Sequence, residues 1–241
     1  MARTLLVRGM LVGLLAALLA FTFASFFGEP QVGRAIAFES AQARAAGEPE
    51  APGPVSRGVQ RTAGLAVGVA MYGVAVGGLF GLAYAVALGR LGRLRSRALA
   101  GVLALAGFVV VELVPFLKYP ANPPSVGDPD TIGRRTLLYL AMLLLSVLAA
   151  WTAGWLARRL LPRLGGWDAA LAGVGAFAVI VAVAMAVLPA VDEVPAAFPA
   201  GVLWRFRLAS LGTQAVLWAG FGLLFGWLTE RAERRVAVTV T

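Results

Sequence analysis

Carboxylates inside and beside apolar segments are the residues of this chain best suited to chemistry. The stretch 111–136, VELVPFLKYPANPPSVGDPDTIGRRT, carries Asp128 and Asp130 two residues apart. Oxygen clusters of this kind hold hard cations, although Asp-Pro is also an ordinary turn opener. Upstream, Glu112 lies in an apolar run, where a carboxylate is costly unless it is paired or hydrated. We therefore predict an ion-handling role for these residues. The alternatives are a local turn and, for Glu112, an ion pair near the interface with Lys118 or Arg205.

Two further stretches carry acidic residues just outside apolar runs. Glu29 lies in FGEPQVGRAIAFE (27–39), and Asp192 with Glu193 lies in LPAVDEVPAAFPAGVLWRFRLASLGTQ (188–214). In the second stretch, Arg205 and Arg207 flank Phe206 where the next apolar run begins, a placement typical of headgroup anchors. Pairing with the outer carboxylates is the alternative for these arginines. The expected charge partners of the acidic residues are Lys118, Arg134, Arg135, Arg205 and Arg207.

Proline also interrupts the apolar run that contains Glu112. Pro115 has no N–H, so an α-helix passing through it leaves the carbonyl of Val111, four residues earlier, without its donor. Irregular backbone at membrane depth is tolerated where it is buried in protein or lines a wet cavity. We expect the backbone around Pro115 to be irregular.

Residues that are missing exclude most enzyme chemistry. The 241 residues include no His and no Cys, which removes the commonest general base, disulfides and thiolate metal sites. A HExxH zinc motif and a Ser–His dyad are impossible, and no GxxxxGK[ST] phosphate loop occurs. The basic residues lie in short stretches between apolar runs rather than on a soluble basic patch, which argues against nucleic-acid binding. We predict that the chain is not an enzyme and holds no permanent cofactor.

The elements that must position the carboxylates are membrane-spanning helices. Hydrophobic residues make up 60% of the chain and charged residues 14%, and the apolar runs are long enough to cross a hydrocarbon layer of about 30 Å. They lack the period-two alternation of barrel strands. We predict an all-α integral membrane protein with about six transmembrane helices. The predicted spans are 9–27, 63–88, 98–117, 136–157, 169–188 and 208–228.

Charge asymmetry predicts the orientation. If both termini are cytoplasmic, 12 of the 21 basic residues and three of the 12 acids lie inside, as the positive-inside rule requires. The Pro-rich, acidic loops then face outward from a multi-pass protein of the cytoplasmic (inner) membrane. A cleaved signal peptide is the alternative for the first run, but the run is long for one and has a poor cleavage site at Ala24–Ser25.

Composition along the chain predicts one membrane domain, residues 1–241, with a flexible outer linker at 40–60. That linker is rich in Pro, Gly, Ala and Glu, and 31–43 could form a short interfacial helix before it. Glycines spaced by four, at 64 and 68, at 73, 77 and 81, and at 222 and 226, predict close helix packing. A path lined by small residues is the alternative.

These stretches also carry a family resemblance. FGEPQV with AIAFE, VPFLKYPANPP.VGDPDTI.RRT, LPAV.EVPA.FPA..LWRFRLASLGTQ..LW and the closing FGLLFG resemble the CbtA-type family of cobalt transporter subunits. The resemblance covers nearly the whole chain and is weakest at 47–56. It implies import of cobalt(II) in support of cobalamin synthesis, together with a small single-span CbtB-type subunit that carries histidines. The family is usually described with five spans rather than six.

The resemblance and the residues together suggest which tasks fall to this subunit and which fall to its partner. Cobalt(II) favours imidazole and carboxylate ligands, and this chain offers only oxygen. We therefore hypothesise that the partner's histidines capture the ion and that this subunit supplies an acidic outer vestibule or pathway. The vestibule would comprise six carboxylates, namely Glu29, Glu112, Asp128, Asp130, Asp192 and Glu193. A non-transporting membrane scaffold or assembly subunit is the alternative function.

Overall fold

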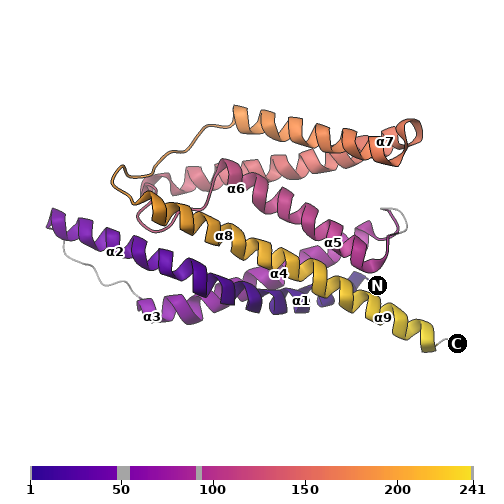
Figure 1. Cartoon of the computed structure of the whole chain (residues 1–241), viewed down its shortest axis with the longest axis horizontal. Helices are drawn as coiled ribbons and strands as arrows, with labels where there is room; N and C mark the ends of the chain where they lie inside the picture. The colour runs from indigo at the N-terminus through magenta and orange to yellow at the C-terminus, as the bar shows by residue number, and fades with distance from the viewer. Residues whose placement is uncertain (1, 48–54, 91–93, 240–241) are drawn as a thin grey trace. The chain divides into compact units, whose positions relative to one another are not determined.

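Helices make up the regular structure of the computed structural model, which describes residues 2–47, 55–90 and 94–239, with side chains to 235 (Figure 1). The all-α prediction is confirmed: no strand occurs in these ranges. The first half contains α1 (Ala2–Phe23), η1 (Ala24–Gly28), α2 (Glu29–Ala46), α3 (Arg57–Val59), η2 (Gln60–Gly64), α4 (Leu65–Ala87) and α5 (Ser96–Gly107). The second half contains η3 (Phe108–Leu113), α6 (Val114–Lys118), η4 (Pro129–Thr131), α7 (Ile132–Val187), α8 (Ala200–Gly220), η5 (Phe221–Phe225) and α9 (Gly226–Thr239).

Within the described ranges, five helical runs are long and apolar enough to cross a membrane. They are Ala2–Ala46, Arg57–Ala87, Ser96–Lys118, Pro129–Val187 and Ala200–Arg235. The sequence predicted six spans, and the count differs because the predicted spans 136–157 and 169–188 belong to one helical run. Helix continues through the basic stretch between them, including Pro162, and the chain reverses at Gly165 (φ 77°, ψ 173°). The positive φ suits glycine, which has no Cβ to clash.

The chain divides into two compact units. Unit 1 contains 1–108, 123–125 and 199–241, and unit 2 contains 109–122 and 126–198. The prediction of a single membrane domain stays a prediction. The segment 40–60, predicted as a flexible linker, is helical at its ends: 40–46 belong to α2, whose Ala-rich end favours helix, and Arg57–Val59 forms α3. Its centre, 48–54, lies outside the described residues. Helix at 31–43 is confirmed, but as part of α2, which continues from α1 through η1 instead of forming a separate short helix. Its interfacial position stays a prediction.

Unit 1 is built on a close antiparallel contact between α1 and α4. A Cβ added at Gly77 would lie 2.4 Å from the carbonyl oxygen of Gly9 and 2.8 Å from the Cα of Gly13. Gly73 meets Gly13 and Gly81 meets Leu5 in the same way. Only glycine allows two helix backbones to approach so closely. The predicted packing seam is therefore confirmed at 73, 77 and 81, whereas Gly68 faces open space.

Aromatic side chains fill the rest of the unit 1 core. Phe80 on α4 packs edge-on against Phe225 of η5, with ring centroids 5.3 Å apart, and lies 5.7 Å from Phe221. Tyr84 and Trp218 complete the cluster. On its other side, Gly222 of η5 packs on Ala104 of α5, so the second predicted glycine series also serves close packing.

Unit 2 is a helical hairpin with a short third helix. The two arms of α7 run out and back (Figure 1), and Gly173 on the return arm lies against the Ala153 carbonyl of the first arm. Met142 and Ala149 from the first arm pack with Val181 and Ala184 from the second. Val114 of α6 joins the same cluster. This packing holds 111–122, 126–136 and the segment 188–198 after α7 within one unit.

Candidate functional site: carboxylates in the two units

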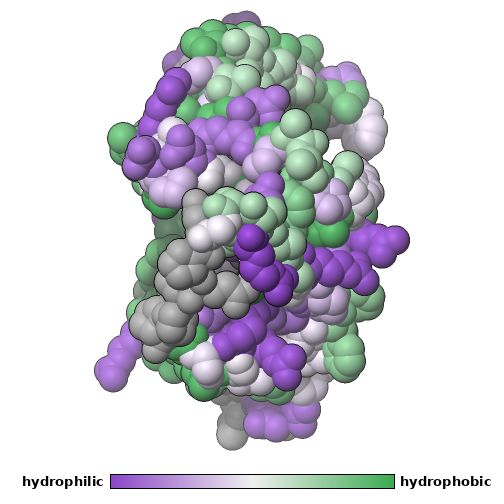
Figure 2. All heavy atoms as spheres, turned by 90° about the vertical axis from the view of Figure 1, so that its left-hand side faces the viewer, coloured by the Kyte–Doolittle hydropathy of each residue, from purple (hydrophilic) through white to green (hydrophobic). Residues whose placement is uncertain are grey.

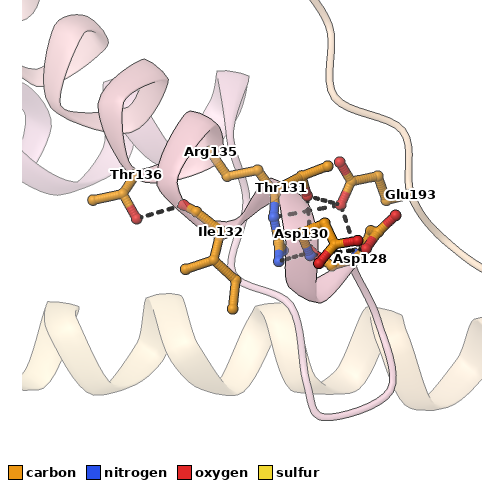
Figure 3. A network of polar contacts seen from close by, with 7 residues as sticks. All are labelled: Asp128, Asp130, Thr131, Ile132, Arg135, Thr136 and Glu193. Atoms are coloured by element: carbon orange, nitrogen blue, oxygen red, sulfur yellow. Dashed lines mark hydrogen bonds and ion pairs between the residues drawn. The ribbon is translucent and has the colours of Figure 1, made fainter.

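Glu193 is the centre of a polar network in unit 2 (Figure 3). One of its oxygens, Oε2, accepts hydrogen bonds from the Asp128 N–H and the Thr131 hydroxyl, each at 2.9 Å. The same oxygen lies 3.4 Å from Nε of Arg135. Arg135 also donates through Nη2 to the Asp128 carbonyl at 3.1 Å. Glu193 therefore fastens the segment after α7 to the turn that precedes α7.

These donors lower the pKa of Glu193. The hydrogen bond from the Asp128 N–H has the largest effect, and the bond from Thr131 and the charges of Arg135 and Arg134 act in the same direction. Desolvation opposes them without reversing the shift. Because hydrogen bonds and nearby cations favour the charged form, Glu193 is a carboxylate held ionised by protein groups.

The network depends on a glycine that the sequence placed beside the acidic pair. Gly127 has φ 109°, and a Cβ there would lie 2.1 Å from Nη1 of Arg135. Any side chain would therefore displace the guanidinium and strain the backbone. Gly127 thus lets Arg135 lie against the turn and reach both Asp128 and Glu193.

Asp128 and Asp130 lie at the same turn, and the Asp-Pro interpretation as a turn opener is confirmed. Asp128 caps η4: its Oδ1 accepts a hydrogen bond from the Asp130 N–H at 2.9 Å. Both residues are exposed, as is Asp192, the neighbour of Glu193. The structure thus gathers Asp128, Asp130 and Glu193 in one network, in which the carboxylates of Asp128 and Asp130 remain exposed.

Glu112 occupies a different environment in the same unit. It lies in the π-helical turn η3, is 6% exposed, and is within electrostatic range of Tyr139 on α7. Lys118, one of the two cations considered as a partner of Glu112, donates from Nζ to the Met185 carbonyl at 2.8 Å. Arg205, the other partner considered, lies exposed on α8 of unit 1.

Irregular backbone near Pro115 is confirmed: the π-helical turn η3 ends at Leu113, and Pro115 lies in the first turn of α6. In a π-helical turn the carbonyl of residue i pairs with the N–H of residue i+5 rather than i+4, so the hydrogen-bond register that leads up to the proline differs from that of an α-helix. The buried hydroxyl of Ser146 on α7 donates to the Val110 carbonyl at 2.7 Å. That the Val111 carbonyl lacks its donor stays a prediction.

Glu29 lies apart from these residues, in unit 1. Its Oε2 forms an ion pair with Nη2 of Arg57 across the start of α2 and α3. The two residues line a pocket of about 480 Å³ together with Ser25, Pro30, Gly33, Arg61 and Thr62. The Glu29 carboxylate is therefore already paired with the guanidinium group of Arg57.

Several residues that complete these arrangements were not predicted from the sequence. Ser146 and Thr131 carry a single hydroxyl each, and nothing local marks either as the partner of a residue far along the chain. The same holds for pairs that join helix ends in unit 1, where Arg8 donates to Thr229 at 2.9 Å and Ser96 to Glu233 at 2.7 Å. For Ser146, the available signal of a buried partner was a hydroxyl in an otherwise apolar run.

No group of three or more acidic residues close enough to hold a metal ion occurs in 2–47, 55–90 and 94–235. The six predicted carboxylates divide between the units, with Glu29 in unit 1 and the others in unit 2.

Comparison with known proteins identifies the family. A family model described as "Probable cobalt transporter subunit (CbtA)" matches residues 2–230. No curated protein and no solved structure matches the chain. The matched range includes all five apolar helical runs apart from the end of the last. The chain belongs to the CbtA family, whose description is that of a probable cobalt transporter subunit and not of an enzyme, and its five apolar helical runs make it a multi-pass membrane protein.

Proposed function

We propose that this chain is the membrane subunit of a cobalt(II) importer in the cytoplasmic membrane, serving cobalamin synthesis. The observation that carries the proposal is the family match over residues 2–230 of a chain with five membrane-length helical runs. Membership as a subunit supports a partner. We propose a small, single-span CbtB-type protein with histidines, because this chain has no imidazole of its own and cobalt(II) favours nitrogen ligands.

The proposed topology has six crossings with both termini inside. As one straight helix, α7 would be about 84 Å long, far more than a bilayer of about 30 Å requires. The reversal at Gly165 divides it into arms 132–164 and 166–187, and the shorter arm alone reaches about 33 Å. Each arm therefore supports one crossing. The arginines near the reversal, at 158, 159 and 163, favour its placement on the cytoplasmic side.

The proposed path for the ion begins at the exposed carboxylates of the network turn. The carboxylates of Asp128, Asp130 and Asp192 are exposed. Glu193 is bonded to the Asp128 N–H rather than to the Asp128 carboxylate, so all three carboxylates can attract a cation while the bonds to Glu193 remain. Glu112, buried at membrane depth, is the proposed deeper contact, since an intramembrane carboxylate marks an ion path by default. Glu29 and Glu193 are left out because guanidinium and hydrogen-bond donors already hold them.

Uptake of radioactive cobalt tests this proposal. The chain would be expressed with and without its partner in cells that lack cobalt import, with nickel and zinc as competitors. We expect uptake to need both proteins. In Asp128→Asn/Asp130→Asn, the cobalt concentration for half-maximal uptake should rise about two- to tenfold, the effect of one or two exposed charge contacts. Asp168→Asn is the matched control, because Asp168 is an exposed carboxylate on the proposed inner side.

Two outcomes would contradict the proposal in different ways. Equal uptake by wild type, the double variant and the Asp168 variant would remove the two aspartates from the path while leaving import intact. Cobalt uptake by the partner alone, unaffected by adding this inserted chain, would refute a transporting role and favour the scaffold or assembly subunit.

A further inference from the structure

The pocket beside Glu29 has the composition of an anion site. Of the charged groups that line it, Arg57 and Arg61 are cationic and Glu29 is anionic, so the lining carries a net positive charge. A cobalt ion would face two guanidinium groups there, which makes the pocket unsuitable for the transported cation. Its volume of about 480 Å³ lies within the range of small-ligand pockets, about 300–1,000 Å³.

Glu29 orients one of the two arginines rather than neutralising both. Nη2 of Arg57 is paired with Glu29, and Nη1 lies 3.5 Å from the Gln60 side-chain oxygen. These contacts fix the plane of the guanidinium, and 35% of the Arg57 side chain remains exposed. Arg61 lies one helical turn further along and is exposed. A planar, fixed guanidinium with a second one beside it matches the geometry of phosphate oxygens.

A buried hydroxyl supplies an independent sign of a missing ligand. Ser25 lines the pocket, and its Oγ is buried without a hydrogen-bond partner among the described residues. Leaving a buried polar group unsatisfied costs about 1–3 kcal/mol, so an acceptor inside the pocket would remove a real penalty. Thr62, on the opposite side, already donates to the Gly58 carbonyl at 2.7 Å, which leaves Ser25 as the available hydroxyl donor.

The position of the pocket along the helices indicates where the phosphate would come from. The apolar run of α1 and η1 ends at Phe27, directly before Glu29, and the apolar run of α4 begins directly after Thr62. Both runs therefore reach the bilayer interface at the level of the pocket, where lipid phosphates lie. Phe26 and Phe27 remain 73% and 57% exposed beside it and offer an apolar surface to acyl chains. Figure 2 views the molecule from the side on which α2 and α3 are labelled in Figure 1, and hydrophilic side chains gather on that face.

We propose that Arg57, Arg61 and Ser25 form a binding site for the phosphate group of an anionic phospholipid. Arg57, held by Glu29, and Arg61 bind the phosphate oxygens, and the Ser25 hydroxyl donates to the same group. The acyl chains lie along the apolar surface that Phe26 and Phe27 begin. The site ties α2, α3 and the α1–α4 pair to the lipid at the membrane surface. Basic pockets next to membrane helices bind lipid headgroups by the same chemistry.

Ligand-dependent thermal stability of the purified full-length chain in detergent tests the site without reference to transport. The probes are phosphatidylglycerol, phosphatidylcholine, glycerol phosphate and inorganic phosphate, each titrated against the apparent melting temperature. We expect phosphatidylglycerol to stabilise the wild type by mass action. Arg61→Gln should raise the concentration for half the effect about tenfold, the value of one charge-assisted hydrogen bond, and Arg61→Lys should restore part of it.

Arg44→Gln is the matched control, because Arg44 is an exposed α2 arginine that bonds the Ser40 carbonyl outside the pocket. Equal stabilisation of wild type, Arg61→Gln and Arg44→Gln by phosphatidylglycerol would overturn the proposal, as would no stabilisation of any of them. If inorganic phosphate or glycerol phosphate matched phosphatidylglycerol in the wild type and failed in Arg61→Gln, the site would take a free phosphate and the lipid assignment would be wrong. Phosphatidylcholine matching phosphatidylglycerol in every variant would also refute a charge-selective site.

Discussion

The contact between α1 and α4 gives the sharpest structural prediction, because backbone meets backbone there. In Gly77→Ala, the new methyl group would lie 2.4 Å from the Gly9 oxygen and 2.8 Å from the Gly13 Cα. Neither obstacle is a side chain that could turn away. Since ordinary contact begins at 3.4 Å, α1 and α4 must separate by about 1 Å, which forfeits roughly a quarter to a half of the dispersion energy of the affected contacts.

The expected loss follows from two opposing effects. Overpacking a filled interior costs about 1–3 kcal/mol, and a backbone obstacle places Gly77 at the upper end. Replacing glycine by alanine inside a helix returns about 1 kcal/mol. We therefore expect Gly77→Ala to lower the free energy of unfolding by about 2 kcal/mol. Gly68→Ala is the matched control on the same helix, and it should be neutral or stabilising by up to about 1 kcal/mol, since nothing lies within 4 Å of its Cβ position.

Thermal unfolding in detergent, followed by the loss of monodisperse protein or by intrinsic tryptophan fluorescence, measures this contrast. A difference of about 3 kcal/mol between the two variants corresponds to about 6–12 °C for a chain of this length. If Gly77→Ala had the same melting temperature as Gly68→Ala, the close approach of α1 and α4 would be wrong. If both melted well below wild type, glycine would be needed for backbone flexibility rather than for packing.

Two further predictions concern unit 2. Ser146→Ala should destabilise the chain by about 1 kcal/mol, because it removes the hydrogen bond from α7 to the Val110 carbonyl. Thr152→Val should be nearly neutral, since Thr152 bonds the Leu148 carbonyl one turn back in its own helix. Equal melting temperatures of the two variants would refute the role of Ser146. The lowered pKa of Glu193 means that its contribution to stability is fully present above the pKa of the unfolded carboxyl and is lost as pH falls through the lowered folded value. Hydrogen exchange at the Asp128 amide, corrected for intrinsic rate, should therefore accelerate on acidification in the wild type. In Glu193→Gln the rate should be insensitive to pH, because the side-chain amide does not titrate. A wild-type rate without acid dependence would contradict the network.

The architecture could be predicted because the bilayer dictates it. Spans follow from the length of apolar runs, and glycines at spacing four follow from the need for close backbones, so α1, α4 and the two arms of α7 were visible in sequence. The residues at which helices end were harder to predict. The arm that begins at Ile132 continues to 164 instead of ending at 157, because the arginines and leucines after 157 favour helix as strongly as the apolar residues before it. Hydropathy marks where the membrane ends, whereas propensity decides where the helix ends.

The candidate site was predictable only in part. Contacts between residues close in sequence could be predicted, whereas contacts between distant residues could not. Asp128 and Asp130 could be read as a pair because a turn is local. Glu193 was named only as an outer carboxylate, because its donors lie more than 60 positions earlier in the chain. A carboxylate that binds a cation and one that fastens a loop have the same residue type, and only its partners distinguish them. The contacts with Asp128, Thr131 and Arg135 give Glu193 a structural role, and for this reason the proposed ion path uses the exposed aspartates and not Glu193.

The turn before Pro115 shows why helical periodicity fails where a carboxylate lies in a membrane helix. A rule based on α-helices assigned the broken hydrogen bond to Val111, but the residues before the proline, Phe108–Leu113, form the π-helical turn η3, which such a rule does not describe. A π turn inserts one residue, so every side chain after it is rotated by about 100° relative to a regular helix. A helical wheel therefore cannot assign the face on which Glu112 lies. Ser146, buried on α7, donates to the Val110 carbonyl within this wide turn and so joins it to α7. Substituting that serine thus tests both the turn and the placement of the buried carboxylate.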